Sequence, residues 1–277
     1  MNGQTMTYLG GLLAALVVAG IARQMKWLTT GGAIATALVG FVIFGLGGPR
    51  FAVPLLVFFL SSSLLSKIGN RQKAGANALS AKGTQRDAGQ VWANGGMAVA
   101  LVLVFCFVGH LWPVDRTRYL LMLFLAALAT VNADTWATEI GSLSSSPPIS
   151  LKNGQKAAPG TSGAVSALGL FASALGAIVI PLSMWLLWHL TLPEFMAVAW
   201  AGFLGCLTDS VFGASVQAKY RDPLTGGITE KTMVSGQKTT RLGGLPWINN
   251  DLVNFLASAC GVLFAWLLLR YSVYLYQ

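Results

Sequence analysis

The sequence predicts an all-α polytopic membrane protein, a transmembrane bundle of about eight helices. Hydrophobic residue types make up 55% of the 277 residues, whereas charged types make up only 10%, well below the roughly 25% of a soluble domain. Apolar stretches near the roughly 20 residues needed to cross a bilayer recur along the whole chain. This composition excludes a disordered protein, a secreted disulfide scaffold and most soluble enzymes.

Eight apolar stretches qualify as spans, several of them loosely. They cover residues 6–22, 28–48, 51–66, 92–112, 118–139, 163–189, 194–217 and 250–270. Arg23 follows the first stretch directly, without a cleavage site of small residues, so we expect a retained helix rather than a signal peptide. Eight spans place both termini on one side. We expect a single transmembrane domain over residues 1–277, with loops on the other side near 67–91, 140–162 and 218–249.

Basic residues are divided unequally between the two sides of these spans. The side that holds the three long loops carries 14 of the 18 lysines and arginines, and the other side carries Arg50, Arg116, Arg118 and Arg270. The positive-inside rule places the side with 14 in the cytoplasm and both termini outside. We expect a prokaryotic plasma-membrane protein whose net charge of +9 is mainly a topology signal. Such a basic face attracts anionic lipids and nucleotides, and no nucleic-acid partner is needed to explain it.

Carboxylates at the ends of apolar spans are costly and are therefore candidates for function. The strongest candidate segment is "NADTWATEIGS", where Asn132, Asp134 and Glu139 stand at the cytoplasmic end of the fifth span. Carboxylate and amide oxygens suit a hard cation such as Mg²⁺. Asp134 and Glu139 are about 140° apart on a helix, so both line one cavity only if the helix loosens or the site wraps around it. Helix capping or pairing with a basic loop residue is the alternative.

The segment "GCLTDSVFGASVQ" repeats this pattern in the seventh span. Asp209 and Ser210 lie within the span, and Gln217 follows eight residues after Asp209 on roughly the same face. Gly205 and Gly213 are interpreted as positions of close helix packing. We expect Asp209 to be functional, although one satisfied polar group in a packed helix is the alternative.

The segment "WINNDLVNF" opens the last span from the cytoplasmic side. Asn249, Asn250 and Asp251 begin it, and Asn254 follows about one turn later. Such a run is also an ordinary helix N-cap. Because this segment is expected at the same membrane depth as Asp134 and Asp209, contact with metal or substrate becomes the favoured interpretation.

The segment "AKGTQRDAGQVWANGG" leads into the fourth span. Lys82, Arg86 and Gln90 recur every four residues, which on a helix forms a polar stripe that Asn94 continues. Lysine and arginine both suit phosphate. A solvated basic loop that serves only topology is the alternative.

A glycine-rich turn, "PGTSGAVSALG", is expected to open the sixth span. Its residues Gly160, Thr161, Ser162 and Gly163 would present backbone N–H groups at a helix N-terminus, which suits phosphate; an ordinary glycine-rich loop is the alternative. The turn lacks the Gly-Lys-Ser/Thr of a Walker A sequence.

Taken together and in order, "KGTQRDAGQVWANGG", "ADTWATEIG", "PGTSGAVSALG", "DSVFGASVQ" and "NNDLVNF" resemble a family of integral membrane proteins long filed as uncharacterised. The resemblance covers about residues 5–270. The best-understood branch of the family is the chloroplast phytyl-phosphate kinase, and the family is distantly similar to dolichol and phytol kinases and to CDP-diacylglycerol synthases. The loop at 220–240 matches least well.

The resemblance implies a Mg²⁺-dependent kinase that converts an isoprenyl monophosphate, such as phytyl phosphate, to the diphosphate with CTP or another nucleoside triphosphate. Its partners would be the isoprenyl phosphate lipid, the nucleotide and membrane lipids. Metal or metal-bound triphosphate is assigned to Asp134, Glu139, Asp209 and Asp251. Phosphate neutralisation is assigned to Lys82 and Arg86. Further binding contacts are assigned to Gln90, Asn94, Asn132, Gly160, Thr161, Ser162, Gly163, Ser210, Gln217, Asn249, Asn250 and Asn254.

Two other functions remain open at this point. A membrane cytidylyltransferase would use the same substrates and the same residues but would make a CDP-lipid and pyrophosphate. A cation-coupled transporter of lipid or solute would also place carboxylates in the membrane, but near the midplane and open to both sides.

Overall fold

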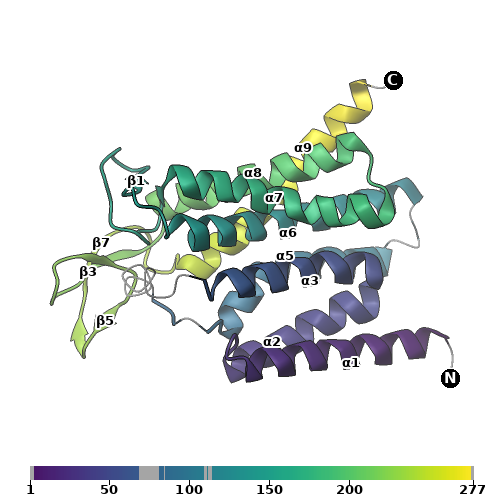
Figure 1. Cartoon of the computed structure of the whole chain (residues 1–277), viewed down its shortest axis with the longest axis horizontal. Helices are drawn as coiled ribbons and strands as arrows, with labels where there is room; N and C mark the ends of the chain where they lie inside the picture. Colours follow the sequence, from purple (N-terminus) through teal and green to yellow (C-terminus); the bar gives the residue numbers. More distant parts are fainter. Residues whose placement is uncertain (1–2, 69–80, 84, 109–110, 112–113, 276–277) are drawn as a thin grey trace.

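The computed structural model describes residues 3–68, 81–83, 85–108, 111 and 114–275. Over these residues the chain folds into a bundle of apolar helices, as expected (Figure 1). Seven helices are long and apolar enough to cross a membrane, and α3 is shorter. The helices are α1 (Gly3–Gln24), α2 (Thr30–Gly40) continued by the π-helix η1 (Phe41–Gly47), α3 (Pro49–Leu65), α5 (Ala88–Val108), α6 (Val114–Gly141), α7 (Ala167–Trp188), α8 (Leu192–Ser215) and α9 (Asn250–Leu275). Each of the eight predicted spans coincides with one of these helices to within a few residues.

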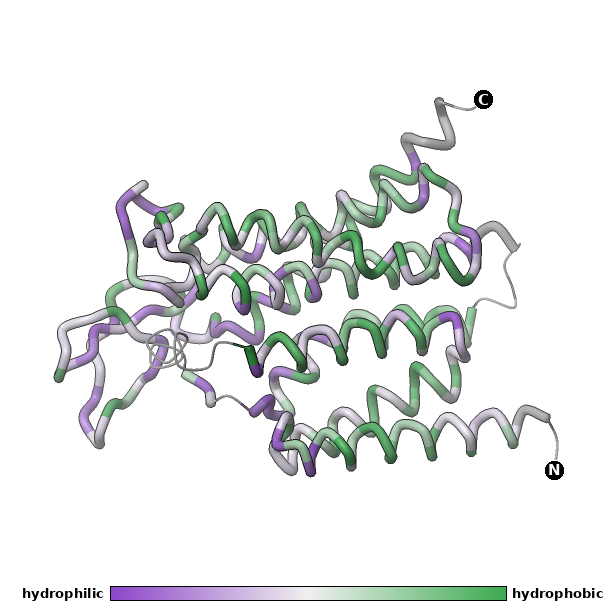
Figure 2. The backbone as a smooth tube through the Cα atoms, in the orientation of Figure 1, coloured by the Kyte–Doolittle hydropathy of each residue, from purple (hydrophilic) through white to green (hydrophobic). Residues whose placement is uncertain are grey.

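The two ends of the bundle differ in their connections. Helix α1 begins and α9 ends at the same end, which we call the terminal end (Figure 1). The connections 142–166 and 216–249, together with residues 81–83 and 85–87, lie at the opposite end, the loop end, where hydrophilic residues gather (Figure 2). The charge distribution predicts that the loop end faces the cytoplasm. Of the loop expected near 67–91, residues 69–80 and 84 lie outside the described residues.

The longer loops form short antiparallel ribbons. In the 142–166 connection, β1 (Ile149–Ser150) pairs with β2 (Ala164–Val165). In the 216–249 connection, β3 (Lys219–Arg221) lies between β4 (Ile228–Thr229) and β7 (Thr240–Gly243), and β5 (Met233–Val234) pairs with β6 (Gln237–Lys238). These ribbons cover the loop end beside the helix termini (Figure 1).

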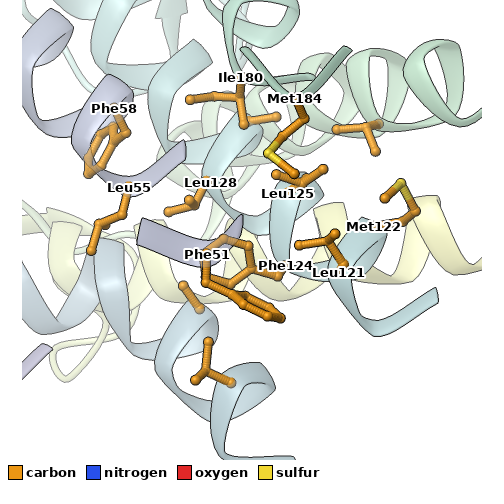
Figure 3. Packing of buried hydrophobic residues seen from close by; sticks show 14 of the residues in the cluster. Phe51, Leu55, Phe58, Leu121, Met122, Phe124, Leu125, Leu128, Ile180 and Met184 are labelled. Atoms are coloured by element: carbon orange, nitrogen blue, oxygen red, sulfur yellow. The ribbon is translucent and has the colours of Figure 1, made fainter. Parts of the chain in front are cut away.

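Helix α6 is the centre of the bundle. In the spanning segment of α6, 72% of the residues are buried, compared with 22–39% in the other six long spans. The core joins aromatic and aliphatic side chains of α3, α6 and α7, among them Phe51, Phe58, Phe124, Leu128 and Met184 (Figure 3).

Small residues set how closely the neighbouring helices approach α6. A Cβ at Gly202 or Gly205 of α8, or at Gly261 of α9, would collide with Ala129 or Thr130 of α6. Because these contacts allow close backbone approach, they bring the loop-end turns of α6, α8 and α9 together. Gly205 therefore has the packing role that the sequence indicated.

Candidate functional site

A cavity of about 340 Å³, the polar cavity, lies at the loop end, lined by α5, α6, α7, α8, α9 and the loops. It brings together most of the predicted site residues from five separate segments of the chain. The predicted residues that line it are Lys82, Arg86, Gln90, Asn94, Asp134, Glu139, Gly160, Thr161, Ser162, Gly163, Asp209, Ser210, Asn250 and Asn254.

Two carboxylates from different helices share one wall of the polar cavity. Asp134 of α6 and Asp209 of α8 are close enough to repel each other. The amide of Asn254 on α9 lies 3.0 Å from Asp209 Oδ2, in the orientation in which its nitrogen donates to the carboxylate. The other amide atom of Asn254 lies 3.3 Å from Asn94 Oδ1. Two carboxylates that repel each other favour a bound cation or a shared proton between them.

The predicted metal set of four carboxylates is not assembled at one point. Among the described residues, no three His, Cys, Asp or Glu side chains converge as a metal-binding group. Asp251 is held in an ion pair with Lys82 instead. Mg²⁺ is usually bound through one or two carboxylates plus substrate phosphates and water. The pair Asp134 and Asp209 fits that requirement.

Glu139 lines the polar cavity together with Asp134, although the two are far apart around the helix. Helix α6 ends at Gly141, and the following residues Ser142 and Pro148 line the cavity as well. The cavity therefore wraps around the end of α6, which is one of the two ways in which both carboxylates can reach it.

Lys82 is clamped between two carboxylates. Its Nζ donates to Asp87 Oδ1 at 2.8 Å and to Asp251 Oδ2. Burial lowers the pKa of Lys82, but these hydrogen bonds and charges outweigh burial and raise the pKa above its ordinary value. Gly89 makes room for the clamp, because a Cβ there would lie 2.5 Å from Asp251 Oδ2.

Arg86 is fixed through both its backbone and its side chain. Its N–H donates to the Trp27 carbonyl at 3.0 Å, and its carbonyl accepts from the N–H of Thr29 at 3.0 Å. The guanidinium lies 5.9 Å above the Phe58 ring. Burial lowers the pKa of Arg86, and the negative charge of Glu139 partly offsets this effect. A buried fork of donors beside a cavity is suited to phosphate.

The helical stripe predicted from the four-residue spacing is wrong for its first half. Lys82 and Arg86 precede α5, which begins at Ala88, and only Gln90 and Asn94 lie on the helix. Asp87 starts the helix in a capping box with Gln90, whose amide oxygen accepts from the Asp87 N–H at 3.0 Å. The four side chains reach the polar cavity nonetheless, because the loop folds back against α2.

The glycine-rich turn lies against α8. Gly160 and Gly163 have φ values of +83° and +73°, and a Cβ at Gly163 would overlap the backbone of Ala214. Strand β2 separates this turn from α7, so the turn does not open the helix directly as predicted. Ser166, which also lines the cavity, is the N-cap of α7 and accepts from the Gly169 N–H at 3.0 Å.

Three further predicted residues do not line the polar cavity. Asn132 is fully buried and donates to the Gly176 carbonyl at 2.7 Å. Gln217 is buried and accepts a hydrogen bond from Ser162 Oγ at 2.6 Å. Asn249 is exposed and accepts from the Leu252 N–H at 3.0 Å, as an N-cap does. All three hold the elements around the cavity in place.

Glu230 is a cavity residue that the sequence did not indicate. It lies in the 216–249 loop and accepts from Gln217 Nε2 at 2.8 Å and from the Ala81 N–H at 3.4 Å. Burial raises the pKa of Glu230, outweighing these hydrogen bonds. Asp87, which bonds to Lys82, was also not assigned from the sequence. Its spacing of three residues from Gln90 is a recognisable capping signal.

Comparison with known proteins relates almost the whole chain to one family. A family model described as integral membrane protein DUF92 matches residues 13–262. Protein PGR of Arabidopsis thaliana is 29% identical over 84% of this chain and 86% of its own length. Uncharacterised membrane proteins of Methanocaldococcus jannaschii and Synechocystis sp. are 27% and 24% identical, over 75% and 90% of this chain and 82% and 85% of their own lengths. No solved structure matches.

Proposed function

The chain belongs to the DUF92 family of integral membrane proteins, and we propose that it is a Mg²⁺-dependent kinase of isoprenyl monophosphates. In this proposal the acceptor is a lipid such as phytyl phosphate, the donor is a nucleoside triphosphate, with CTP expected, and the product is the isoprenyl diphosphate. The reaction takes place at the loop end, which the charge distribution predicts to face the cytoplasm.

One observation carries the proposal. The polar cavity places a pair of carboxylates, Asp134 and Asp209, and two cations, Lys82 and Arg86, around the same space. Phosphoryl transfer needs both: carboxylates to hold a divalent cation, and positive side chains to neutralise the phosphates. Hydrolysis through a Ser–His–Asp triad has no support, because the two histidines, His110 and His189, stand near the predicted outer ends of spans.

The proposed reaction exchanges one phosphorus–oxygen bond for another. A phosphate oxygen of the acceptor attacks the γ-phosphorus of the triphosphate, the bond from that phosphorus to the β–γ bridging oxygen breaks, and the nucleoside diphosphate leaves. A phosphate monoester has a second pKa of about 6, so the acceptor is already a dianion near neutral pH. The reaction therefore needs no general base, and positioning and charge neutralisation are sufficient.

The side chains divide these tasks. Asp134 and Asp209 would hold Mg²⁺, which when bound neutralises and orients the phosphate oxygens of the triphosphate. Asn254 would keep Asp209 oriented through its amide. Arg86 and Lys82 would bind phosphate. Further contacts from amide, hydroxyl and backbone groups are proposed for Gln90, Asn94, Asn250, Ser210 and Gly160–Gly163.

The proposal is tested by the products formed from two substrates. Purified protein in detergent is incubated with Mg²⁺, CTP or ATP, and geranylgeranyl or phytyl monophosphate, and the lipid and nucleotide products are resolved. We expect isoprenyl diphosphate and CDP. A CDP-lipid with pyrophosphate would contradict the kinase and indicate a cytidylyltransferase at the same site. No turnover with any donor, in protein with a cooperative thermal transition, would contradict both and favour transport.

A further inference from the structure

A second cavity, the apolar cavity, lies beside the polar cavity inside the bundle. Its walls come from α1, α2, η1, α3 and α5, and include the side chains of Val18, Val39, Phe44, Leu55, Phe59 and Val91. Its lining residues extend from Leu28 and Arg86 at the loop end to Phe44, deeper in the bundle. Phe44 is 14 residues beyond the first residue of α2 at the loop end, which is roughly 20 Å along a helix axis.

The two cavities meet at three polar residues. Arg86, Gln90 and Asn94 line both of them. A ligand that occupies both cavities must therefore carry an apolar part on one side of these residues and a polar part on the other. The Arg86 guanidinium is buried against Phe58 at this junction, and the charge of Glu139 only partly offsets its burial, so it favours an anionic polar part next to it.

The orientation of the two cavities matches a lipid in the bilayer. The polar cavity is at the loop end, where the hydrophilic residues gather (Figure 2), and the apolar cavity extends from there into the spanning part of the helices. A lipid of the adjacent leaflet would have its head at the level of Arg86 and its chain parallel to α2 and α3.

The apolar cavity is narrow, about 50 Å³, so a chain enters it only if one wall moves. Helix α1 is the wall best placed to move, because it lies at the edge of the bundle and packs mainly on α2 and η1 (Figure 1). The remainder of a long chain would extend past α1 into the bilayer.

We infer that the apolar cavity receives the phosphate-proximal part of the isoprenyl chain, and that Arg86 binds the phosphate where the two cavities meet. This inference rests on the proposed function, because it takes the isoprenyl monophosphate as the ligand of the polar cavity. It identifies α1, α2, α3 and α5 as the lipid-binding half of the protein. The bundle of α6, α7, α8 and α9 then holds the metal-bound nucleotide.

A binding measurement that needs no turnover tests this inference. Geranylgeranyl monophosphate with a diazirine in its first isoprene unit is cross-linked to the wild-type protein, and the modified residues are located by mass spectrometry. We expect modification of residues of α1, α3 or α5 that line the apolar cavity. Cross-links confined to α6–α9, or equal labelling by a diazirine lipid without a phosphate, would overturn the inference.

Two adjacent residues of α1 provide a matched pair of variants. Val18 lines the apolar cavity, whereas Val17 is 51% exposed on the outer surface. Val18→Trp should raise the Kd for geranylgeranyl monophosphate by at least about tenfold, because the added ring fills the cavity. Val17→Trp should change it less than about twofold, and the Kd for CTP should be unchanged in both. Equal effects of the two variants would overturn the inference.

The two proposals fail in different ways. Cross-linking to the apolar cavity without formation of isoprenyl diphosphate would contradict the kinase proposal but support a binding site for an anionic lipid. Kinase activity with cross-links elsewhere would support the kinase proposal but contradict the proposed lipid site.

Discussion

The two ends of the bundle use their charged side chains differently. At the terminal end, Arg118 of α6 and Glu194 of α8 form a two-pronged ion pair, with Arg118 Nη2 donating to Glu194 Oε2 at 2.7 Å. The same carboxylate completes the capping box that begins α8, accepting from the Thr191 N–H at 2.8 Å. At the loop end, Asp134 and Asp209 stand beside each other and face a cavity.

This difference separates charge that completes the fold from charge that is arranged for a ligand. Arg118 and Glu194 satisfy each other and join two helices. Asp134 and Asp209 repel each other when both are ionised, which is costly unless a cation or a shared proton lies between them. A transporter would need polar groups that lead through to the other side, whereas Arg118 and Glu194 at the terminal end are used in an ion pair and a helix cap.

The largest effect is expected from removing a charge of the carboxylate pair. Asp134→Asn and Asp209→Asn should each lower kcat/KM for isoprenyl diphosphate formation by at least about a hundredfold, because each removes an anionic ligand of the proposed Mg²⁺. Steady-state assays over a range of Mg²⁺ concentrations measure this loss. Glu194→Gln at the terminal end is the control and should leave kcat/KM within about twofold. Full activity of both aspartate variants would contradict the assigned site.

An intermediate effect is expected at the glycine-rich turn. Gly163→Ala places a side chain both at a positive φ and against the backbone of Ala214. The strain costs about 1–3 kcal/mol, and the collision adds about 1–3 kcal/mol more. Gly154→Ala is the matched control, because Gly154 has a φ of +68° but nothing within 4 Å of the added atom.

Thermal unfolding in detergent compares the two glycine variants. Gly163→Ala should lower Tm more than Gly154→Ala and should also reduce turnover, because its loop lines the polar cavity. Equal Tm values would show that the turn does not depend on close packing against α8.

The smallest effect is a change in the pH dependence of stability. Burial raises the folded-state pKa of Glu230 above the unfolded value, so the folded protein binds the proton more tightly. Stability is therefore greatest below the unfolded pKa and falls as pH rises through the folded pKa. Glu230→Gln removes this fall, so its Tm should rise relative to wild type as pH increases above the ordinary glutamate pKa of about 4.3.

Asp222 gives the opposite sign as a control. Hydrogen bonds from Leu224 and Thr225 lower the pKa of this exposed carboxylate, so its contribution is present above the unfolded pKa and is lost as pH falls. Asp222→Asn should therefore lose Tm relative to wild type as pH rises. A shift of the same sign in both variants would contradict the burial of Glu230.

Adjacent residues show how far the sequence predicts the site. Asn132 and Asp134 occur in the same motif and were assigned together, but they are about 200° apart on α6. Asn132 therefore faces inward and bonds to α3 and α7, with Ser61 Oγ 3.1 Å from its Oδ1. Only Asp134 reaches the polar cavity. A motif identifies the segment, but the face toward the cavity depends on which helices surround it.

The loop residues show a different limit. Glu230 is one acidic residue in a polar loop and has no periodic pattern around it. It reaches the polar cavity because Gln217, at the end of α8, bonds to it and to Ser162 together. The clamp on Lys82 likewise joins the loop before α5 to the first turn of α9, 169 residues apart. Such pairings depend on the approach of distant segments and leave no local signal.

The sequence alone determined the eight helices, the shared end of the two termini and the segments that carry the polar groups. The physical reason is local: the free energy of placing a segment in a bilayer depends on the residues of that segment. The tertiary structure decided which of those polar groups face one another. Close contacts such as Gly205 against Thr130 and Gly213 against the turn at Gly163 set the approach of α8. That approach brings Asp209 beside Asp134 and leaves Asp251 paired with Lys82.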